Sequence, residues 1–298
     1  MTDHSIGVDI SKSHLDVFRL EDGMAKRFDN SVAGFRALTR WLGKTPVARV
    51  VFEPTGAYHK AFEVALGGKL PLVKVNPLQA RRFAEAYGTR AKTDAVDARM
   101  LARMGAAFAL EPQAPCSKEI RVLRDLHVAR AGLIKDRTRL RNRAQTQNIS
   151  VLKPQTKTRL TLVERQIAEL DTEIATLIDA QESTARRCDI LRSMPGVGAV
   201  TAAAMLTLMP EIGTLDHKQV ASLAGLAPIT RQSGQWQGKA FIGSGRKPLR
   251  DALYMPALVA IRCNPDLKVK YTHLRTAGKP AKVAIVACIG KTVSQTVF

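Results

Sequence analysis

The chain has 298 residues, of which 45% are hydrophobic and 5% aromatic, so it can fold as one large or two ordinary globular domains. Its 46 Lys and Arg residues against 26 Asp and Glu residues give a net charge of +20, which indicates a polyanionic partner, most often nucleic acid. No apolar run of about 18 residues and no signal-peptide pattern occurs, so we expect no transmembrane helix and a cytoplasmic protein. A membrane surface is the weaker interpretation of the charge, because no isolated basic amphipathic segment or lipidation signal occurs.

The four cysteines lie far apart, without a CxxC pair, and the six histidines are scattered. This spacing argues against a disulfide framework and against a zinc site built from cysteine or histidine. Any metal ion here should therefore be a hard one, held by oxygen ligands.

The first third of the chain alternates between strand and helix patterns. Three strands come first, and helices and strands then alternate, which is the order of an RNase H-like (RuvC-like) α/β domain. The expected strands are residues 5–10, 15–18, 24–28, 47–53 and 70–75, and the expected helices are 31–42, 57–66, 77–87 and 92–101.

Beyond Pro112 and Pro115 the pattern becomes helical. Leucines recur every seven residues from Leu126, and a second apolar seam runs from Leu160 to Leu177, which predicts an antiparallel helical hairpin or coiled-coil arm. The sequence thus predicts three regions: an α/β domain at 1–112, the arm at 113–188, and a mainly helical C-terminal domain at 189–298.

The C-terminal region contains two stretches that suit phosphate binding. Pro195 to Gly198 form a turn between helices, as in helix-hairpin-helix units that bind phosphates through backbone amides, although a plain tight turn fits too. Residues 225–250 are basic, rich in glycine and free of acids. Within them Ser233 is either a linker residue or a nucleophile.

Four carboxylates fall at the ends of predicted elements in the first domain. Asp9 lies on the first strand and Glu53 ends the fourth, while Asp94 and Asp97 share one face of a helix. Phosphodiester chemistry with two Mg²⁺ ions needs three or four convergent carboxylates. We therefore expect these four to hold the ions.

Other readings of the acids stay open from the sequence. Asp94 with Lys92, or Asp97 with Arg99, could be surface ion pairs instead. Three further acids of the first domain are expected to be solvated: Asp16, Glu63 and Glu85.

Basic residues and glycines in the predicted helices and turns are the candidate contacts to nucleic acid. They are Arg81, Arg82, Arg137, Arg141, Gly196, Gly198, Arg231, Lys239, Arg246 and Lys247.

The motifs IGVDISK, FEPTGAY and KTDAVDARMLA, followed by SMPGVGAVTAAAML and LAGLAPITRQSGQWQGKAFIGSGRKPLRDALYMPAL, resemble those of the "IS one-ten" insertion-sequence transposases, relatives of the Piv invertase. Nearly the whole chain is covered. The resemblance implies a DEDD tetrad at Asp9, Glu53, Asp94 and Asp97. It also implies a serine nucleophile at Ser233. Ser244 competes for that role, but relatives commonly have glycine there.

The resemblance further implies an RNA-guided transposase that joins donor and target DNA through a phosphoserine intermediate, acting as a dimer that assembles into a tetramer on the nucleoid. A shared site with Ser233 from a neighbouring subunit is one hypothesis. The alternatives are a RuvC-like junction-resolving nuclease that uses metal-activated water, and a non-catalytic nucleic-acid-binding scaffold. One departure is the end of the chain, 288–298, which has a glycine, Gly290, within the expected helix and little amphipathic pattern. We expect its last turn to be altered or frayed, and an inactive copy is the alternative to an active one.

Overall fold

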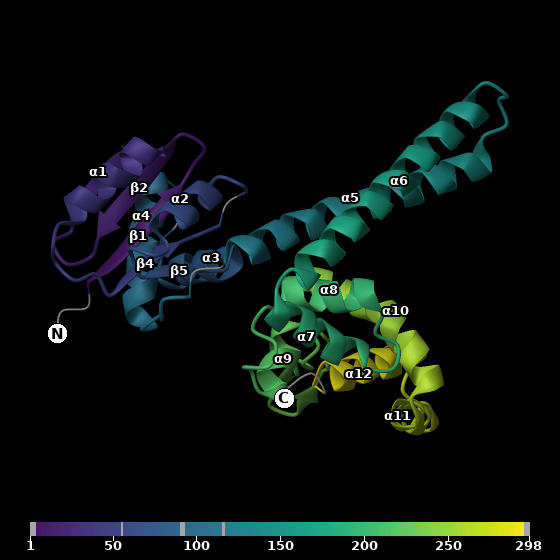
Figure 1. Cartoon of the computed structure of the whole chain (residues 1–298). Helices are drawn as coiled ribbons and strands as arrows, with labels where there is room; N and C mark the ends of the chain where they lie inside the picture. Colours follow the sequence, from purple (N-terminus) through teal and green to yellow (C-terminus); the bar gives the residue numbers. More distant parts are fainter. Residues whose placement is uncertain (1–3, 55, 90–92, 115–116, 295–298) are drawn as a thin grey trace. The chain divides into compact units, whose positions relative to one another are not determined.

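The computed structural model describes residues 4–54, 56–89, 93–114 and 117–294. The chain divides into two compact units, Met1–Cys116 and Ser117–Phe298 (Figure 1). The second unit contains both the predicted arm and the predicted C-terminal domain, so the boundaries expected at 112 and 188 stay predictions; Pro115 lies outside the described residues. None of the described helices is long and apolar enough to cross a membrane.

The first unit is built on a five-stranded mixed sheet with the order β3-β2-β1-β4-β5. Strands β1 to β3 form an antiparallel meander, and β4 and β5 extend it in parallel with β1. This arrangement is compatible with the RNase H-like domain expected from the sequence. The strands are β1 Ser5–Ile10, β2 His14–Arg19, β3 Ala25–Asp29, β4 Arg49–Phe52 and β5 Leu72–Lys74.

Helices cover both faces of this sheet, as Figure 1 shows. Alternate residues of a strand point to opposite faces, so Ile6 and Val8 pack against α1 (Val32–Leu42) and α2 (His59–Leu66). The other face carries α3 (Pro77–Ala86) and α4 (Asp94–Ala107), against which Val51 packs. The expected helix limits of α1 are confirmed, because the Ser31 hydroxyl accepts a hydrogen bond from the Gly34 amide and the helix ends at Gly43.

Gly7 lets α4 lie directly on β1. A Cβ atom at Gly7 would stand 1.9 Å from the Ala98 carbonyl oxygen and 2.5 Å from the Ala102 amide nitrogen. Two residues earlier on the same strand face, the Ser5 hydroxyl donates a hydrogen bond of 2.8 Å to the Ala102 carbonyl. Helix and strand therefore run side by side, and the start of α4 comes level with the end of β1.

Replacing Gly7 with alanine should destabilise the protein by about 3 kcal/mol, at the upper end of overpacking costs, because the new methyl group meets helix backbone that cannot rotate away. Urea unfolding measures this change. Gly68→Ala is the matched control in the same unit, since a Cβ there meets nothing within 4 Å. Equal stability of both variants would contradict this account of how α4 is placed.

The second unit starts with two long helices, α5 (Lys118–Thr146) and α6 (Leu152–Asp179). They run antiparallel, since Arg130 pairs with Asp171 while Arg141, farther along α5, pairs with the earlier Glu164. The expected pair of helices is present; its coiled-coil character stays a prediction.

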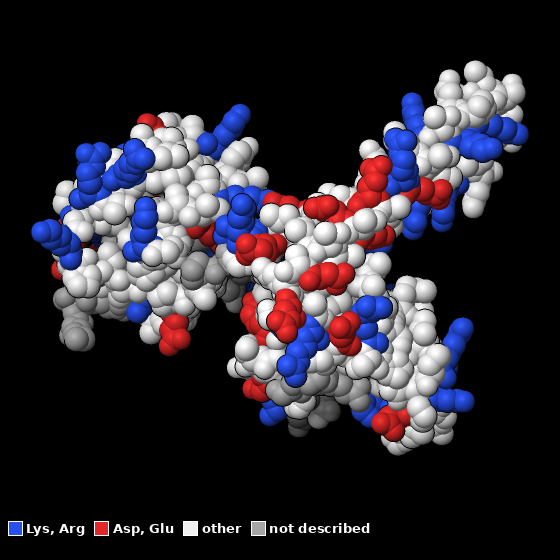
Figure 2. Space-filling model, viewed as in Figure 1, with Lys and Arg blue, Asp and Glu red and all other residues white. Residues whose placement is uncertain are grey.

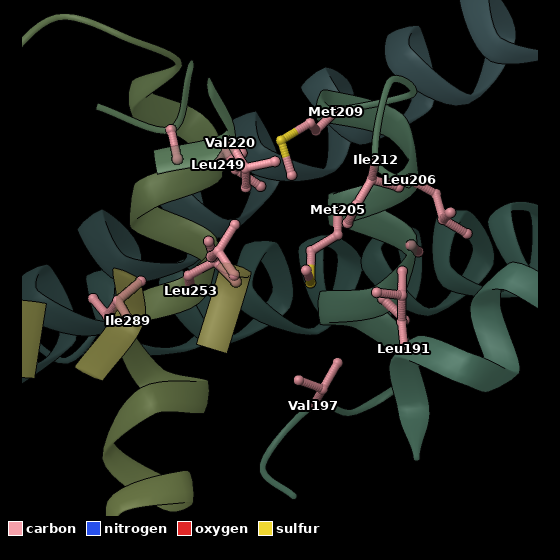
Figure 3. Packing of buried hydrophobic residues seen from close by; sticks show 14 of the residues in the cluster. Leu191, Val197, Met205, Leu206, Met209, Ile212, Val220, Leu249, Leu253 and Ile289 are labelled. Atoms are coloured by element: carbon pink, nitrogen blue, oxygen red, sulfur yellow. The ribbon is translucent and has the colours of Figure 1, made fainter. Parts of the chain in front are cut away.

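The remaining helices pack around one hydrophobic core (Figure 3). Leu191 of α7, Met205 of α8 and Leu253 of α10 meet there, and Leu123 of α5 joins them, so the base of the helix pair shares this core. The elements are α7 Glu182–Arg192, α8 Ala199–Leu208, α9 His217–Leu223, β6 Gln232–Ser233, β7 Trp236–Gln237, α10 Lys247–Cys263, α11 Pro265–Thr276 and α12 Ala281–Ser294.

Helix α12 continues through Gly290 to Ser294, and the last turn of the chain, which we expect to be altered or frayed, lies outside the described residues. Ile289 and Val293 are both buried in the core, and this burial offsets the low helix propensity of one glycine.

Candidate active site

Three elements of the first unit bring the four predicted carboxylates to one edge of the sheet. Asp9 lies near the end of β1, and Glu53 directly follows Phe52, which pairs in parallel with Val8. The first turn of α4 supplies the other two carboxylates, Asp94 and Asp97.

Local signals explain why α4 starts where it does. The Thr93 hydroxyl accepts a hydrogen bond from the Val96 amide and so caps the helix at Asp94. Acids in a first turn also interact favourably with the positive end of the helix dipole. The helix thus tolerates two carboxylates at the point where it meets the end of β1.

The charges of this edge act on Asp9. Burial is the main cause that raises the pKa of Asp9 from its usual 3.8 to about 6. The charges of four nearby carboxylates raise it further, in the order Asp94, Asp97, Asp16 and Glu53. A half-buried cluster of oxygen donors that repel one another is the donor set that a hard divalent cation suits.

The carboxylates nevertheless do not form a ready-made metal cage. Among the described residues, no three Asp, Glu, His or Cys side chains stand close enough together to hold an ion. Metal binding would require Asp9 and its neighbours to draw closer together.

The raised pKa of Asp9 has a consequence for stability. A carboxyl group with a higher pKa in the folded state binds its proton more tightly there, so stability falls as pH rises from about 4 to about 6 and stays reduced above that. With a chelator present to remove metal ions, Asp9→Asn should therefore raise the melting temperature at pH 8 and leave it nearly unchanged at pH 4. Scanning calorimetry at both pH values checks this; a lower melting temperature of the variant at pH 8 would contradict it.

The expectation that Asp16 is solvated is wrong. Asp16 is only 8% exposed, and it lies opposite Asp9 in the β1–β2 register. It also receives two hydrogen bonds, of 3.0 and 2.9 Å, from the Arg27 guanidinium. Counting strand pairs outward from the turn at Ser11 to Ser13 would have placed it beside Asp9.

The other two acids differ from each other. Glu63 is partly buried, with both oxygens within 2.8 Å of Lys74 Nζ, so it is less solvated than expected. Glu85 is exposed, as expected, and pairs with Arg81.

The alternative surface pairs of the tetrad, Asp94 with Lys92 and Asp97 with Arg99, stay predictions. Asp94 lies 3.6 Å from Arg27, while Lys92 lies outside the described residues. The Arg99 guanidinium stands 5.1 Å from the ring centroid of Phe18, a cation–π contact.

In the second unit, Ser233 is exposed on a two-stranded hairpin. It pairs with Trp236 across the β6–β7 ladder, and Gly234 takes the positive φ of 57° that the tight turn needs. Trp236 is 59% exposed, which the sequence reasoning did not single out. The hairpin therefore presents a hydroxyl and an aromatic ring to solvent on an acid-free segment.

Ser244, the competing serine, has a different role in the fold. It has a φ of 58°, a left-handed conformation that favours glycine. Its carbonyl accepts a hydrogen bond from Arg250, and a Cβ at Gly225 would stand 2.3 Å from that same oxygen. Ser244 thus shapes a tight turn.

Some of the predicted nucleic-acid contacts have a structural role instead, and the others lie on the surface or pair with acids. Arg246 donates to both oxygens of Glu211 and to the Leu208 carbonyl, so its hydrogen bonds serve the fold. Gly196 is also structural, since a Cβ there would stand 2.7 Å from the Pro256 carbonyl oxygen. Three of the others pair with nearby acids: Arg81, Arg141 and Lys247. Four are exposed: Arg82, Gly198, Arg231 and Lys239. Arg137 is half-buried.

Positive charge gathers at the far end of the α5–α6 pair. Residues 137–163 contain no acid, and Lys and Arg side chains occupy the surface towards this end in Figure 2, whereas acids lie over its middle. Such an acid-free end suits a phosphate backbone.

Known proteins match the chain over almost its whole length. A family model described as transposase matches residues 6–149, and one described as transposase IS116/IS110/IS902 family matches residues 188–272. The pilin gene-inverting proteins of Moraxella lacunata and Moraxella bovis are each 32% identical over 98% of this chain and 95% of their own length. The IS110 uncharacterized 43.6 kDa protein of Streptomyces coelicolor is 29% identical over 50% of this chain and 36% of its own.

The two family-model matches contain the carboxylate edge in the first unit and the Ser233 hairpin in the second. A relative of this identity over this length shows the family, and the family consists of enzymes that act on DNA. The chain therefore belongs to the IS110 family of transposases and is a DNA transposase/recombinase.

Proposed function

We propose that the protein cuts and rejoins DNA with a metal site formed by Asp9, Glu53, Asp94 and Asp97 and a nucleophile at Ser233. The observation that carries the proposal is the approach of carboxylates from the end of β4 and from the first turn of α4 to half-buried Asp9 of β1, whose pKa burial and these carboxylates raise to about 6. A protein gains nothing in stability from such an arrangement, which indicates a functional site.

The four carboxylates fit two Mg²⁺ ions by their chemistry, since they offer only hard oxygen donors. When bound, the ions would neutralise charge on the scissile phosphate and on the leaving oxygen. Asp9 and Glu53 would hold the ions from the sheet, and Asp94 and Asp97 from α4.

Ser233 would attack the phosphorus atom. Its hydroxyl oxygen forms a bond to phosphorus and loses its proton, while the bond from phosphorus to the leaving DNA oxygen breaks and that oxygen gains a proton. The product is a phosphoserine ester, and attack by the free 3′-OH of another strand reverses the reaction. The number of phosphoester bonds is unchanged, so no nucleotide hydrolysis is needed.

The partners of the proposal are donor DNA, target DNA and a structured guide RNA. The charge of +20 supports a polyanionic partner, and the acid-free end of α5–α6 and the exposed Arg231 and Lys239 supply surfaces for it. A homodimer that assembles into a tetramer on the bacterial nucleoid would bring two DNA duplexes together.

Trapping tests this function against a nuclease that uses metal-activated water. The full chain, with copurified RNA, is incubated with Mg²⁺ and DNA that carries the sequences flanking its gene, and is then denatured. A protein–DNA adduct joined through serine, together with a single structured RNA species in the preparation, is expected. Cleavage without any adduct would favour the water mechanism and overturn the serine proposal.

A further inference from the structure

A row of charged residues crosses the sheet beside the proposed metal site. In the antiparallel ladders, Arg27 of β3 lies opposite Asp16 of β2, and Asp16 lies opposite Asp9 of β1. Paired residues of antiparallel strands point to the same face of the sheet. This is the face that α4 covers, because Gly7, two residues before Asp9, contacts that helix.

Asp16 is thereby a fifth carboxylate next to the tetrad. It is buried, and its strand partner is Asp9. By position and chemistry it could serve as a metal ligand as well as the tetrad members do.

Arg27 occupies both oxygens of Asp16. Its Nε and Nη2 atoms donate hydrogen bonds of 3.0 and 2.9 Å to the two carboxylate oxygens, a bidentate pairing. The same Nη2 lies 3.6 Å from the Asp94 carboxylate. The guanidinium is half-exposed, so it spans from buried Asp16 to the rim where Asp94 lies.

We propose that Arg27 masks Asp16, so that the ions bind at the four carboxylates of the tetrad instead of at a five-carboxylate cluster. Arg27 is then a specificity-determining residue that sets how tightly and where the divalent ion binds. This inference rests on the proposed metal site.

The proposal predicts that substitutions of Arg27 and of Asp16 change the affinity for a divalent ion in opposite directions. Arg27→Gln removes one positive charge and frees both Asp16 oxygens beside Asp9, which should tighten Mn²⁺ binding about tenfold. Asp16→Asn instead leaves Asp94 as the carboxylate that the Arg27 guanidinium pairs with, so Mn²⁺ should bind about tenfold more weakly. In the double variant both charges are gone, and affinity should return to within about threefold of the unsubstituted protein.

Mn²⁺ is the probe, titrated into the metal-free full chain and followed by the electron paramagnetic resonance signal of the free ion. Lys26→Gln is the matched control, since Lys26 is exposed on the same strand and its side chain points to the opposite face, with a cation–π contact to Phe28. It should leave the affinity unchanged.

The outcomes separate the two proposals. Tight Mn²⁺ binding that changes in the same direction, or not at all, in Arg27→Gln and Asp16→Asn would overturn the mask and leave the tetrad site standing. Absence of Mn²⁺ binding by the unsubstituted protein would overturn both. If Arg27→Gln fails to fold because Asp16 is left buried and unpaired, the weaker binding of Asp16→Asn and its recovery in the double variant still decide the question.

Discussion

Replacing Asp9 with alanine is expected to slow DNA cleavage at least about 10³-fold, or ~4 kcal/mol in activation free energy, while the protein stays folded. Asp9 is the carboxylate on which the others act, so its removal takes away the ligand at the centre of the proposed site. The negative charge of Asp9 destabilises the folded state, so the Asp9→Ala variant should lose activity without losing stability when a chelator is present at pH 8.

Cleavage rates in Mg²⁺, with melting temperatures of the same samples, measure both parts of this prediction. Glu85→Ala is the control, because Glu85 is an exposed acid of the same unit that pairs with Arg81 on its own helix. It should keep the rate within about twofold. Asp9→Ala with a normal rate would show that the carboxylate edge takes no part in catalysis.

Ser233→Ala is expected to abolish the covalent protein–DNA adduct and to lower recombination by at least about 10³-fold, since loss of a nucleophile removes the first bond-forming step. The hairpin is exposed and the serine hydroxyl is small, so the fold should not change. Binding of DNA, measured by fluorescence anisotropy, should therefore stay within about twofold of the unsubstituted protein.

Ser244→Gly is the matched control for the nucleophile. Glycine adopts the φ of 58° at this position more readily than serine does, so this variant should form the adduct at a normal rate and be as stable as the unsubstituted protein. An adduct that persists in Ser233→Ala and disappears in Ser244→Gly would transfer the nucleophile to Ser244.

Much of the carboxylate edge follows from the sequence, because local rules govern it. Thr93 caps a helix whose first turn carries two acids, and a β-branched run ends one residue before Glu53. What the sequence could not supply is how closely α4 approaches β1. That approach depends on Gly7 contacting Ala98, which lies 91 residues later in the chain.

The pairings of Asp16 with Arg27 and of Arg246 with Glu211 could not be predicted from local sequence either. Asp16 looked like a solvated residue of a hairpin, yet register places it opposite Asp9, and Arg27 reaches it from a third strand. Arg246 looked like a phosphate ligand, yet Glu211, 35 residues earlier in the chain, binds it within the fold. In both cases long-range pairing decides whether a charge is available to a ligand.

The metal site is the central claim, and crystals of the full chain soaked in Mn²⁺ test it most directly. An anomalous difference map collected at the manganese edge should show density between Asp9 and Asp94, with carboxylate oxygens at roughly 2.2 Å from the ion. Density at this place that vanishes in crystals of Asp9→Ala would establish the site. A map with manganese elsewhere on the chain, and none at the end of β1, would contradict it.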